Sequence, residues 1–278
     1  MTTGYLIFSS LSTNGENGDR MDRRIASLTG FAVLLWLLIF GGCSRTEYQW
    51  GWYEVLPTTL RGTDNLMFLL GGLRLTISLA SVSIVISICL GLLVALPGLA
   101  ANRLLRVFNR VYVETFRSVP TLVMILWVYY GLPVVFGVSL GPFTAGVLAL
   151  ALCDSAFEAE IFRGGIQSIE RGQIEAADAI GLGYIHKMRL VILPQAIRRI
   201  LPPLGNQFVY MLKMSSLVSV VGLQELTRKA NELTVTVYRP LEIYTVLVLE
   251  YLLLILIVSR SVRWLETRLG SNAQFSGR

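Results

Sequence analysis

The sequence predicts an all-α polytopic membrane protein, and two features of its composition support that fold class. Of the 278 residues, 54% are hydrophobic and only 15% are charged, and the mean hydropathy is +0.61. Soluble proteins have roughly 25% charged residues. A soluble fold of this length could not bury so much apolar surface, so we expect the excess to face lipid. In lipid, the backbone of a spanning segment is best satisfied as a helix.

The rarity of histidine and cysteine excludes several kinds of site. The chain has one histidine, His186, and 3 cysteines, with no CxxC pair and no cluster at metal-ligand spacing. A disulfide framework or a zinc site is therefore not expected. The formal net charge of +6 could suggest a nucleic-acid partner, but the basic residues lie in short segments between apolar stretches, as in membrane proteins. We expect no metal site, no catalytic residues and no nucleic-acid partner, and we expect His186 to be solvated or to face a partner.

Six stretches are long and apolar enough to be membrane helices, which need about 20 apolar residues each. They cover residues 25–42, 68–96, 113–135, 143–162, 204–223 and 241–262. We expect the chain to divide into a disordered cytoplasmic tail (1–24), an extra amino-terminal helix with a periplasmic linker (25–65), a transmembrane domain (66–269) and a second cytoplasmic tail (270–278).

The first of these helices has an alternative interpretation. Arg23 and Arg24 followed by an apolar stretch that ends at Cys43 are also typical of a lipoprotein signal that is cleaved before the cysteine. Phe40 is an unusual residue three positions before such a cleavage site, which favours a retained helix. Cleavage would leave the following helices unchanged.

The distribution of basic residues sets the expected orientation. With the amino terminus inside the cell, most of the 24 Lys and Arg residues fall in four cytoplasmic segments: the two tails, the segment around 103–110 and a long loop at about 163–203. Lys and Arg are enriched on the cytoplasmic side of membrane proteins. We therefore place this loop in the cytoplasm.

Small residues recur along one face of the predicted helix 68–96. Ser83, Ser87, Gly91 and Ala95 follow one another at intervals of four residues. Small residues at this spacing allow two helix backbones to approach closely. We expect this face to pack inside the helix bundle rather than to form a subunit interface.

The loop at 163–203 contains the most informative pattern. It is too apolar for a solvated loop and contains too many Gly and Pro residues for a span. We predict a short helix at 175–180 that Gly181 and Gly183 end, then an amphipathic helix at 184–193 that Pro194 stops. The first helix has a small apolar surface beside the acids Glu175 and Asp178, which suits burial in the groove of a partner. The residues predicted to dock are Glu175, Ala176, Ala177, Asp178, Ala179, Ile180, Gly181 and Gly183.

These residues resemble the EAA loop of ABC-importer permeases. Glu175-Ala176-Ala177, Gly181 and a terminal Leu193-Pro194 stand at that spacing, although Val191 replaces the usual Ile or Leu. Four further segments resemble the polar amino-acid permease family, which includes histidine, glutamine, arginine and opine transporters. They are ETFRSVPTLVMILWVYYGLP (114–133), EIFRGGIQSI (160–169), LPPLGNQF (201–208) and SSLVSVVGLQELT (215–227). The similarity extends from about residue 66 to 269.

The resemblance implies a type I ABC-importer permease bundle of five core helices, here with one extra amino-terminal helix, in the bacterial inner membrane. Such a permease pairs with a copy of itself or a homologous permease, docks two ATPase subunits and receives an amino acid from a periplasmic binding protein. The chain has no GxxxxGK[ST] motif, so ATP and Mg would be bound by the ATPase subunits and this chain would bind no cofactor. An alternative is a secondary ion-coupled amino-acid transporter, but such carriers commonly show internal repeats, and none is evident here.

Ionisable residues fall near the middle of three predicted spans. At 1.5 Å per residue, Asp154, Lys213 and Glu250 each lie about 15–18 Å from a predicted membrane surface. Charges at this depth are unfavourable and often functional. We hypothesise that they line the substrate path, with Lys213 meeting a carboxylate and the acids an ammonium group. Glu158 and Arg74 are secondary candidates, and a structural ion pair among these charges is the alternative.

Two details of these charges bear on that hypothesis. The family usually has an acid directly after the lysine, but Met214 follows Lys213 here. Either the negative charge has moved to another helix, or the substrate preference differs. Glu160 and Arg163 stand three residues apart, and we expect them to form a local pair.

Overall fold

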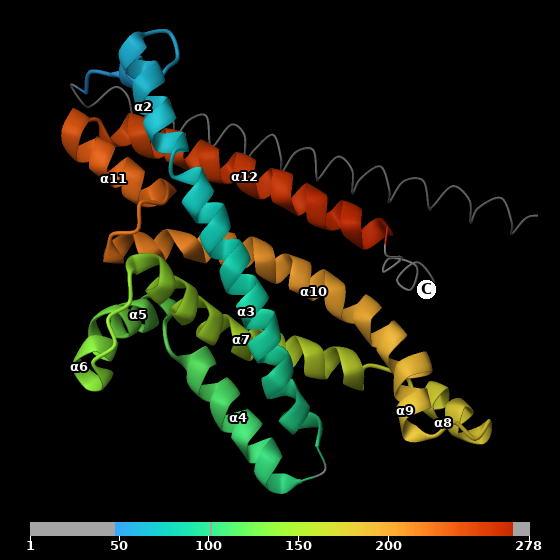
Figure 1. Cartoon of the computed structure of the whole chain (residues 1–278). Helices are drawn as coiled ribbons and strands as arrows, with labels where there is room; N and C mark the ends of the chain where they lie inside the picture. Colours follow the sequence, from blue (N-terminus) through green and yellow to red (C-terminus); the bar gives the residue numbers. More distant parts are fainter. Residues whose placement is uncertain (1–47, 101, 269–278) are drawn as a thin grey trace, which may run out of the picture. The chain divides into compact units, whose positions relative to one another are not determined.

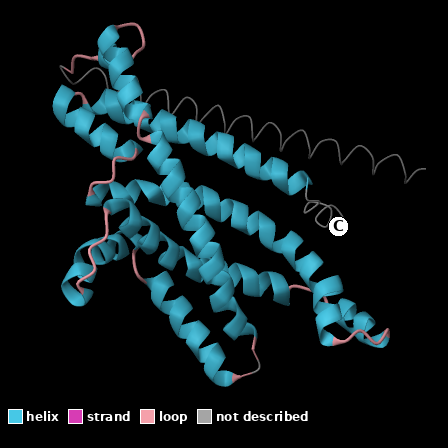
Figure 2. Cartoon of the chain, viewed as in Figure 1, coloured by secondary structure: helices cyan, strands magenta, loops and turns pink. Residues whose placement is uncertain are grey.

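The computed structural model describes residues 48–100 and 102–268, in which every regular element is a helix (Figures 1 and 2). The chain divides into two compact units, Met1–Trp50 and Gly51–Arg278. The tails predicted at 1–24 and 270–278, and the first predicted helix with its signal-like alternative, lie outside the described residues.

The described elements all belong to the second unit. In chain order they are η2 (Trp52–Glu54), α2 (Leu60–Leu70), α3 (Leu73–Leu99), α4 (Arg103–Ser118), α5 (Thr121–Leu126), η3 (Trp127–Gly131), α6 (Leu132–Phe136), α7 (Pro142–Gln167), α8 (Arg171–Ala179), α9 (Tyr184–Lys187), η4 (Met188–Ile192), α10 (Leu193–Met214), η5 (Ser215–Val221), α11 (Leu226–Val237) and α12 (Pro240–Arg268).

The predicted helix 68–96 is wrong in its bounds, because the structure has two successive helices, α2 and α3. The break lies at Gly71 and Gly72. A Cβ on Gly72 would lie 2.6 Å from the backbone nitrogen of Leu226. Glycine at this position therefore allows the start of α11 to pack directly against the chain between α2 and α3.

The span predicted at 113–135 is also wrong as a single straight helix. The helix starts earlier, at Arg103, where the Asn102 side chain accepts a hydrogen bond from the backbone N–H of Leu104 at 2.8 Å. It ends at Ser118, and the following α5–α6 segment is bent away by 96°. Pro120 explains the break, because proline forces the preceding Val119 into an extended conformation (φ −83°, ψ 126°).

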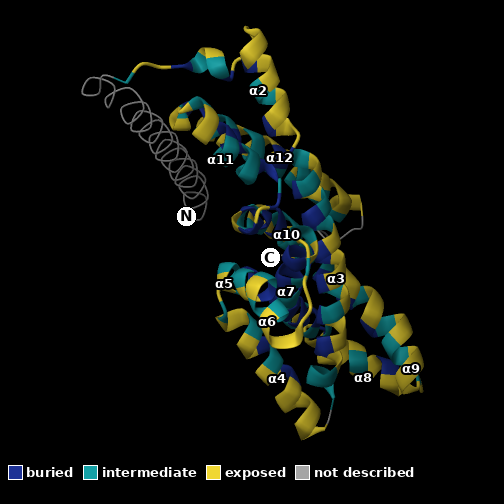
Figure 3. Ribbon diagram, turned by 60° about the vertical axis from the view of Figure 1, so that its left-hand side comes forward, coloured by how far each residue is buried: buried dark blue, intermediate teal, exposed yellow. Residues whose placement is uncertain are grey.

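Helices α3 and α7 form the centre of the bundle. The four small residues of the predicted stripe, Ser83, Ser87, Gly91 and Ala95, are all buried. A Cβ on Gly91 would lie 2.4 Å from the Cβ of Glu158 on α7. The stripe therefore packs inside the bundle, as predicted. Figure 3 shows the buried face of α7 within the surrounding helices.

The helix predicted at 184–193 does not stop at Pro194, and the span predicted at 204–223 starts earlier than expected. Helix α9, the π-helical η4 and α10 follow one another directly. Pro194 lies in the first turn of α10, where proline is tolerated, and the wider π-helical turn precedes it. Helix α10 also contains Pro202 and Pro203, and the 3₁₀ segment η5 follows it directly.

Two helical stretches of the described residues, Leu60–Leu99 and Pro240–Arg268, are long and apolar enough to cross a membrane. The bent pair Arg103–Ser118 and Thr121–Phe136 would be a third if it is one span. The sequence predicts spans in α7 and α10 as well. Helix α7 carries Asp154, Ser155 and Glu158 in its buried face, which a helix covered by protein can contain.

Two of the segments that the sequence predicts to be cytoplasmic lie at the same end of the bundle. The start of α4 lies at the same end as α8 and α9, and α2 and α11 lie at the other end (Figures 1 and 3). Two of the segments predicted to be cytoplasmic are therefore on the same side of the bundle, as the distribution of basic residues requires.

The close approach of α3 and α7 generates a stability prediction. Gly91→Ala places a methyl group against Glu158 and should destabilise the fold by about 1–3 kcal/mol, as overpacking typically does. Gly164→Ala is the matched control, since no atom lies within 4 Å of its added Cβ. Thermal unfolding of the detergent-solubilised protein measures both. A midpoint for Gly91→Ala equal to that of the control would contradict the packing argument.

Candidate functional site

The loop predicted to dock a partner forms a compact helical hairpin. Its first helix, α8, is longer than the predicted 175–180 and has Ile180 as its C-cap. The backbone N–H of Leu182 donates to the carbonyl of Ala177 at 3.1 Å, and that of Gly181 donates to Asp178 at 2.9 Å. This is a Schellman motif, which requires the left-handed φ of +79° at Gly181. The predicted helix end at Gly181 is confirmed.

Two of the predicted docking residues hold the hairpin together. The Lys187 Nζ on α9 lies 2.6 Å from the Asp178 Oδ1 on α8, and the Lys187 side chain is only 16% exposed. Ala177 is buried against the hairpin, at 3% exposure. The other predicted residues are exposed, and the Asp178 side chain is itself 54% exposed. Of the predicted set, only Ala177 is buried and so does not belong to the outward surface.

The tip of the hairpin presents bulky apolar side chains. Ile180, which the sequence prediction includes, and Tyr184 and Ile185, which it missed, are 75%, 72% and 74% exposed. His186 beside them is exposed, as expected. Exposed apolar patches of this kind mark interaction sites. The signal available in the sequence was the apolar pair that directly follows Gly183.

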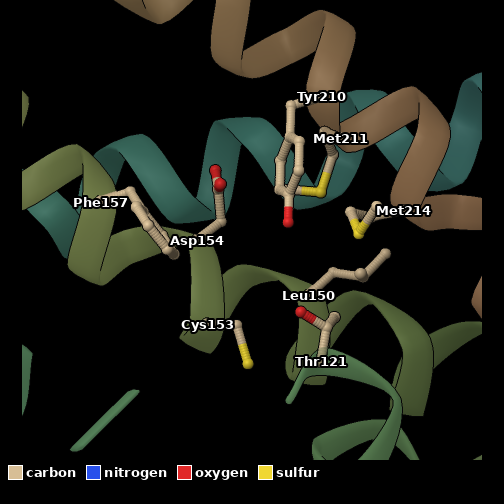
Figure 4. Close-up of a pocket in the computed structure, with 8 residues that line it drawn as sticks. All are labelled: Thr121, Leu150, Cys153, Asp154, Phe157, Tyr210, Met211 and Met214. Carbon is tan, nitrogen blue, oxygen red and sulfur yellow. The ribbon is translucent and has the colours of Figure 1, made fainter. Parts of the chain in front are cut away.

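A small pocket of about 10 Å³ lies between α5, α7 and α10 (Figure 4). Helix α7 contributes Leu150, Cys153, Asp154 and Phe157, and α10 contributes Tyr210, Met211 and Met214, with Thr121 from the start of α5. The residues from α7 recur at i, i+3, i+4 and i+7, which is one face of a helix. In the view of Figure 4, the Asp154 carboxylate projects between Phe157 and Tyr210.

Asp154 is the charged group of this pocket and is 4% exposed. The Ser87 Oγ on α3 donates to one carboxylate oxygen at 2.8 Å, and the Gln207 Nε2 on α10 donates to the other. Both donors are neutral, and none of the ion pairs among the described residues involves Asp154. The pocket thus holds a carboxylate that is solvated by the protein but not neutralised by a basic side chain.

The structure does not bring the other midplane candidates into this pocket. Lys213 is exposed, and it forms no ion pair within the described part of the chain. Glu158 is fully buried one turn from Asp154, and neither of its carboxylate oxygens has a hydrogen-bond partner. The carboxylate of Glu250 on α12 is likewise buried without a partner. Arg74 near the start of α3 is exposed.

The sequence left open one ion pair that involves Lys213 and predicted another between Glu160 and Arg163. The structural ion pair that the sequence left open between Lys213 and the midplane acids is not formed among the described residues. The local pair is confirmed, because the Arg163 guanidinium lies 2.6 Å from the Glu160 carboxylate.

The partners of Asp154 were missed by the sequence prediction, although a pattern was available. Gln207, Tyr210, Met211 and Met214 stand at i, i+3, i+4 and i+7, so they share one face of α10. That face and the equivalent face of α7 meet at the pocket.

Comparison with known proteins identifies the family. Residues 87–271 match the model of the binding-protein-dependent transport system inner membrane component. The glutamine transport system permease protein GlnP of Escherichia coli (strain K12) is 33% identical over 222 residues, which cover 80% of this chain and 98% of GlnP. The arginine transport system permease protein ArtQ of Bacillus subtilis (strain 168) is 35% identical over 205 residues, which cover 74% of this chain and 94% of ArtQ.

Solved structures agree with this result. A chain in the crystal structure of an amino acid ABC transporter with histidines matches with a TM-score of 0.70 and 39% identity, covering 74% of this chain and 96% of that one. A chain of the inward-facing MetNI methionine ABC transporter matches with a TM-score of 0.63 and 24% identity, covering 74% and 98%, and supports the fold alone. This chain belongs to the family of binding-protein-dependent transport system inner membrane components, the permeases of ABC importers.

Proposed function

We propose that this protein is the permease subunit of an ATP-driven importer that moves polar or charged amino acids across the bacterial inner membrane. The observation that carries this proposal is the identity of 33–35% over almost the whole length of relatives named as glutamine and arginine permeases. The outward face of α8 and the apolar tip of the hairpin are consistent with docking of a separate motor.

The proposed architecture is a type I bundle of five core helices at 66–269. The core helices correspond to α2–α3, α4–α6, α7, α10–η5 and α12. An extra helix and periplasmic linker at 25–65, a cytoplasmic tail at 1–24 and another at 270–278 complete the proposal. The hairpin within 163–203 lies on the cytoplasmic side.

The proposed assembly contains two permeases, either two copies of this chain or this chain with a homologous permease. Two ATPase subunits bind ATP and Mg²⁺ on the cytoplasmic side, and a periplasmic protein delivers the amino acid. Glu175, Ala176, Ala179 and Ile180 face the ATPase subunit, while Ala177, Asp178, Gly181 and Gly183 shape the hairpin that presents them.

The hairpin is suited to transmit motion to the pocket. The Asp178–Lys187 ion pair joins α8 to α9, and α9, η4 and α10 run on without a break from Tyr184 to Met214. This run of helix is about 45 Å long at 1.5 Å per residue. Its far end carries Tyr210 and Met214 of the pocket. A displacement of α8 by the ATPase would therefore move one wall of the pocket as a rigid body, which is a common form of switching.

The pocket supports a role for Asp154 in binding the positively charged end of an amino acid. Its carboxylate lacks a cationic partner in the described structure, and the rings of Phe157 and Tyr210 line the same space. Carboxylates and aromatic faces both attract ammonium and guanidinium groups. Exposed Lys213, next to Met214 of the pocket, is proposed to meet the substrate carboxylate. Glu158, Glu250 and Arg74 are secondary positions of the same path.

Reversing the charge of Glu175 tests the docking surface. Glu175→Arg should weaken co-purification of the ATPase subunit and lower ATP-driven uptake at least several-fold, because it places a positive charge where the proposed docking face presents a negative one. Glu170→Arg is the matched control, an equally exposed acid directly before α8 and outside the docking set. Normal ATP-driven uptake by Glu175→Arg would exclude the docking role. Ion-gradient-driven accumulation by this chain alone would instead support the secondary transporter.

Neutralising Asp154 tests the pocket. Asp154→Asn should lower uptake of a cationic amino acid by about tenfold or more, because a charge-assisted hydrogen bond contributes roughly 1.5–3 kcal/mol. Glu250→Gln is the comparison variant, because it changes a buried acid on α12 that is only a secondary position of the path and does not line the pocket. Its loss of uptake should be smaller. Uptake into vesicles at equal protein expression is the measurement. Equal losses in the two variants would show that the pocket does not define the path.

A further inference from the structure

Helix α4 is amphipathic in a way that the transport proposal does not use. Its exposed apolar side chains, Leu104, Phe108 and Val111, recur at helical spacing and are 79%, 59% and 57% exposed. Arg106, Asn109, Arg110, Val113 and Arg117 lie at the complementary spacing, and all of them line a cleft that faces α7. In a helix of a membrane bundle the apolar face contacts lipid, and the charged face is turned toward the protein interior.

The cleft between α4 and α7 is wide and rich in arginine. Its volume is about 290 Å³, and its charged lining residues are Arg106, Arg110, Glu114, Arg117, Glu160 and Arg163. The Asn109 Nδ2 donates to the Val94 carbonyl at 2.7 Å and so anchors α4 against α3. The cleft is therefore a built feature of the fold rather than a gap beside a loose helix.

Two of the four arginines of the cleft have a side-chain partner, and the other two form no ion pair among the described residues. Arg163 is paired with Glu160 at 2.6 Å, and the guanidinium of Arg117 lies 5.0 Å from the centroid of the Phe157 ring. Arg106 and Arg110 form no ion pair among the described residues, and both are exposed. With Glu114 as the remaining acid, the cleft has a surplus of positive charge at its open end.

The position of the cleft decides which anion it suits. The start of α4 lies at the same end of the bundle as α8 and α9, which the proposed function places at the cytoplasm (Figure 1). Basic clefts between helices at this level bind the head groups of anionic lipids. Arginine suits a phosphate group because its planar fork donates two parallel hydrogen bonds. The exposed apolar face of α4 contacts the surrounding leaflet, so lipid headgroups lie within reach of the cleft at this level.

We propose that the α4–α7 cleft is a binding site for an anionic phospholipid of the cytoplasmic leaflet. Arg106 and Arg110 hold the headgroup phosphate, and the acyl chains extend from the cleft into the lipid around the bundle. The inference rests on the proposed function only for the orientation of the chain in the membrane. It depends on neither the identity of the amino acid nor the docking of the ATPase.

The test is lipid binding by the whole transporter, purified with its partner subunits and incubated with equal amounts of phosphatidylglycerol and phosphatidylcholine. Native mass spectrometry gives the ratio of the two bound lipids. In Arg106→Gln/Arg110→Gln the preference for phosphatidylglycerol should fall on the order of tenfold, since each basic residue near an anionic surface contributes about a factor of five. Arg106→Lys/Arg110→Lys should retain most of it.

Arg198→Gln/Arg260→Gln is the matched control, because it removes two exposed arginines that lie outside the cleft, on α10 and near the end of α12. An equal loss in this control, or an unchanged ratio in Arg106→Gln/Arg110→Gln, would overturn the site. Displacement of phosphatidylglycerol by inorganic phosphate alone would also overturn it, in favour of a free anion. Loss of the ATPase subunit at an unchanged lipid ratio would assign the cleft to a protein partner.

Binding of phosphatidylcholine and a monodisperse elution profile report whether each variant is folded. Amino-acid uptake is measured separately. A transporter that keeps its lipid preference but does not import amino acids would refute the proposed function and leave the lipid site intact, so the two failures can be distinguished.

Discussion

The close contact between α3 and α7 is the constraint on which the rest of the bundle depends. At Gly91 the two helices approach so closely that an added Cβ would lie 2.4 Å from the Cβ of Glu158. That approach places the Ser87 hydroxyl within 2.8 Å of Asp154. A buried carboxylate without hydrogen bonds would be strongly unfavourable. Small residues on α3 therefore do more than permit packing, because they allow one helix to solvate the charge carried by the other.

Helix α7 contributes residues to both the pocket that contains Asp154 and the arginine-rich cleft. One face carries Asp154 and Phe157 into the pocket, and its inner end carries Glu160 and Arg163 into the basic cleft. The Arg117 guanidinium, a cleft residue, lies over the ring of Phe157, a pocket residue. The two regions are thus connected through one cation–π contact, and α10 connects the pocket to the helical hairpin on the same side of the bundle as the cleft.

Two irregularities in the helices, the break at Pro120 and the π-helical turn before Pro194, affect where the lining side chains lie. Pro120 bends the chain by 96° between α4 and α5, which puts Thr121 at the pocket while α4 borders the cleft. The π-helical turn before Pro194 has the opposite effect, since it lets the helix continue through a proline. Proline therefore breaks one helix and is absorbed by another, depending on the backbone around it.

The sequence by itself determined the helical membrane class, the end of the first loop helix at Gly181, the small-residue face of α3 and the Glu160–Arg163 pair. Each of these depends on composition or on residues a few positions apart, so local spacing is enough to predict them. Only the tertiary structure decided that Ser87 and Gln207, 67 and 53 residues from Asp154, are its partners, and that Lys213 is not. It also decided that Ala177 and Asp178 stabilise the hairpin from within. Such contacts depend on how separate helices pack and rotate against one another, and the periodicity of a single helix does not contain that information.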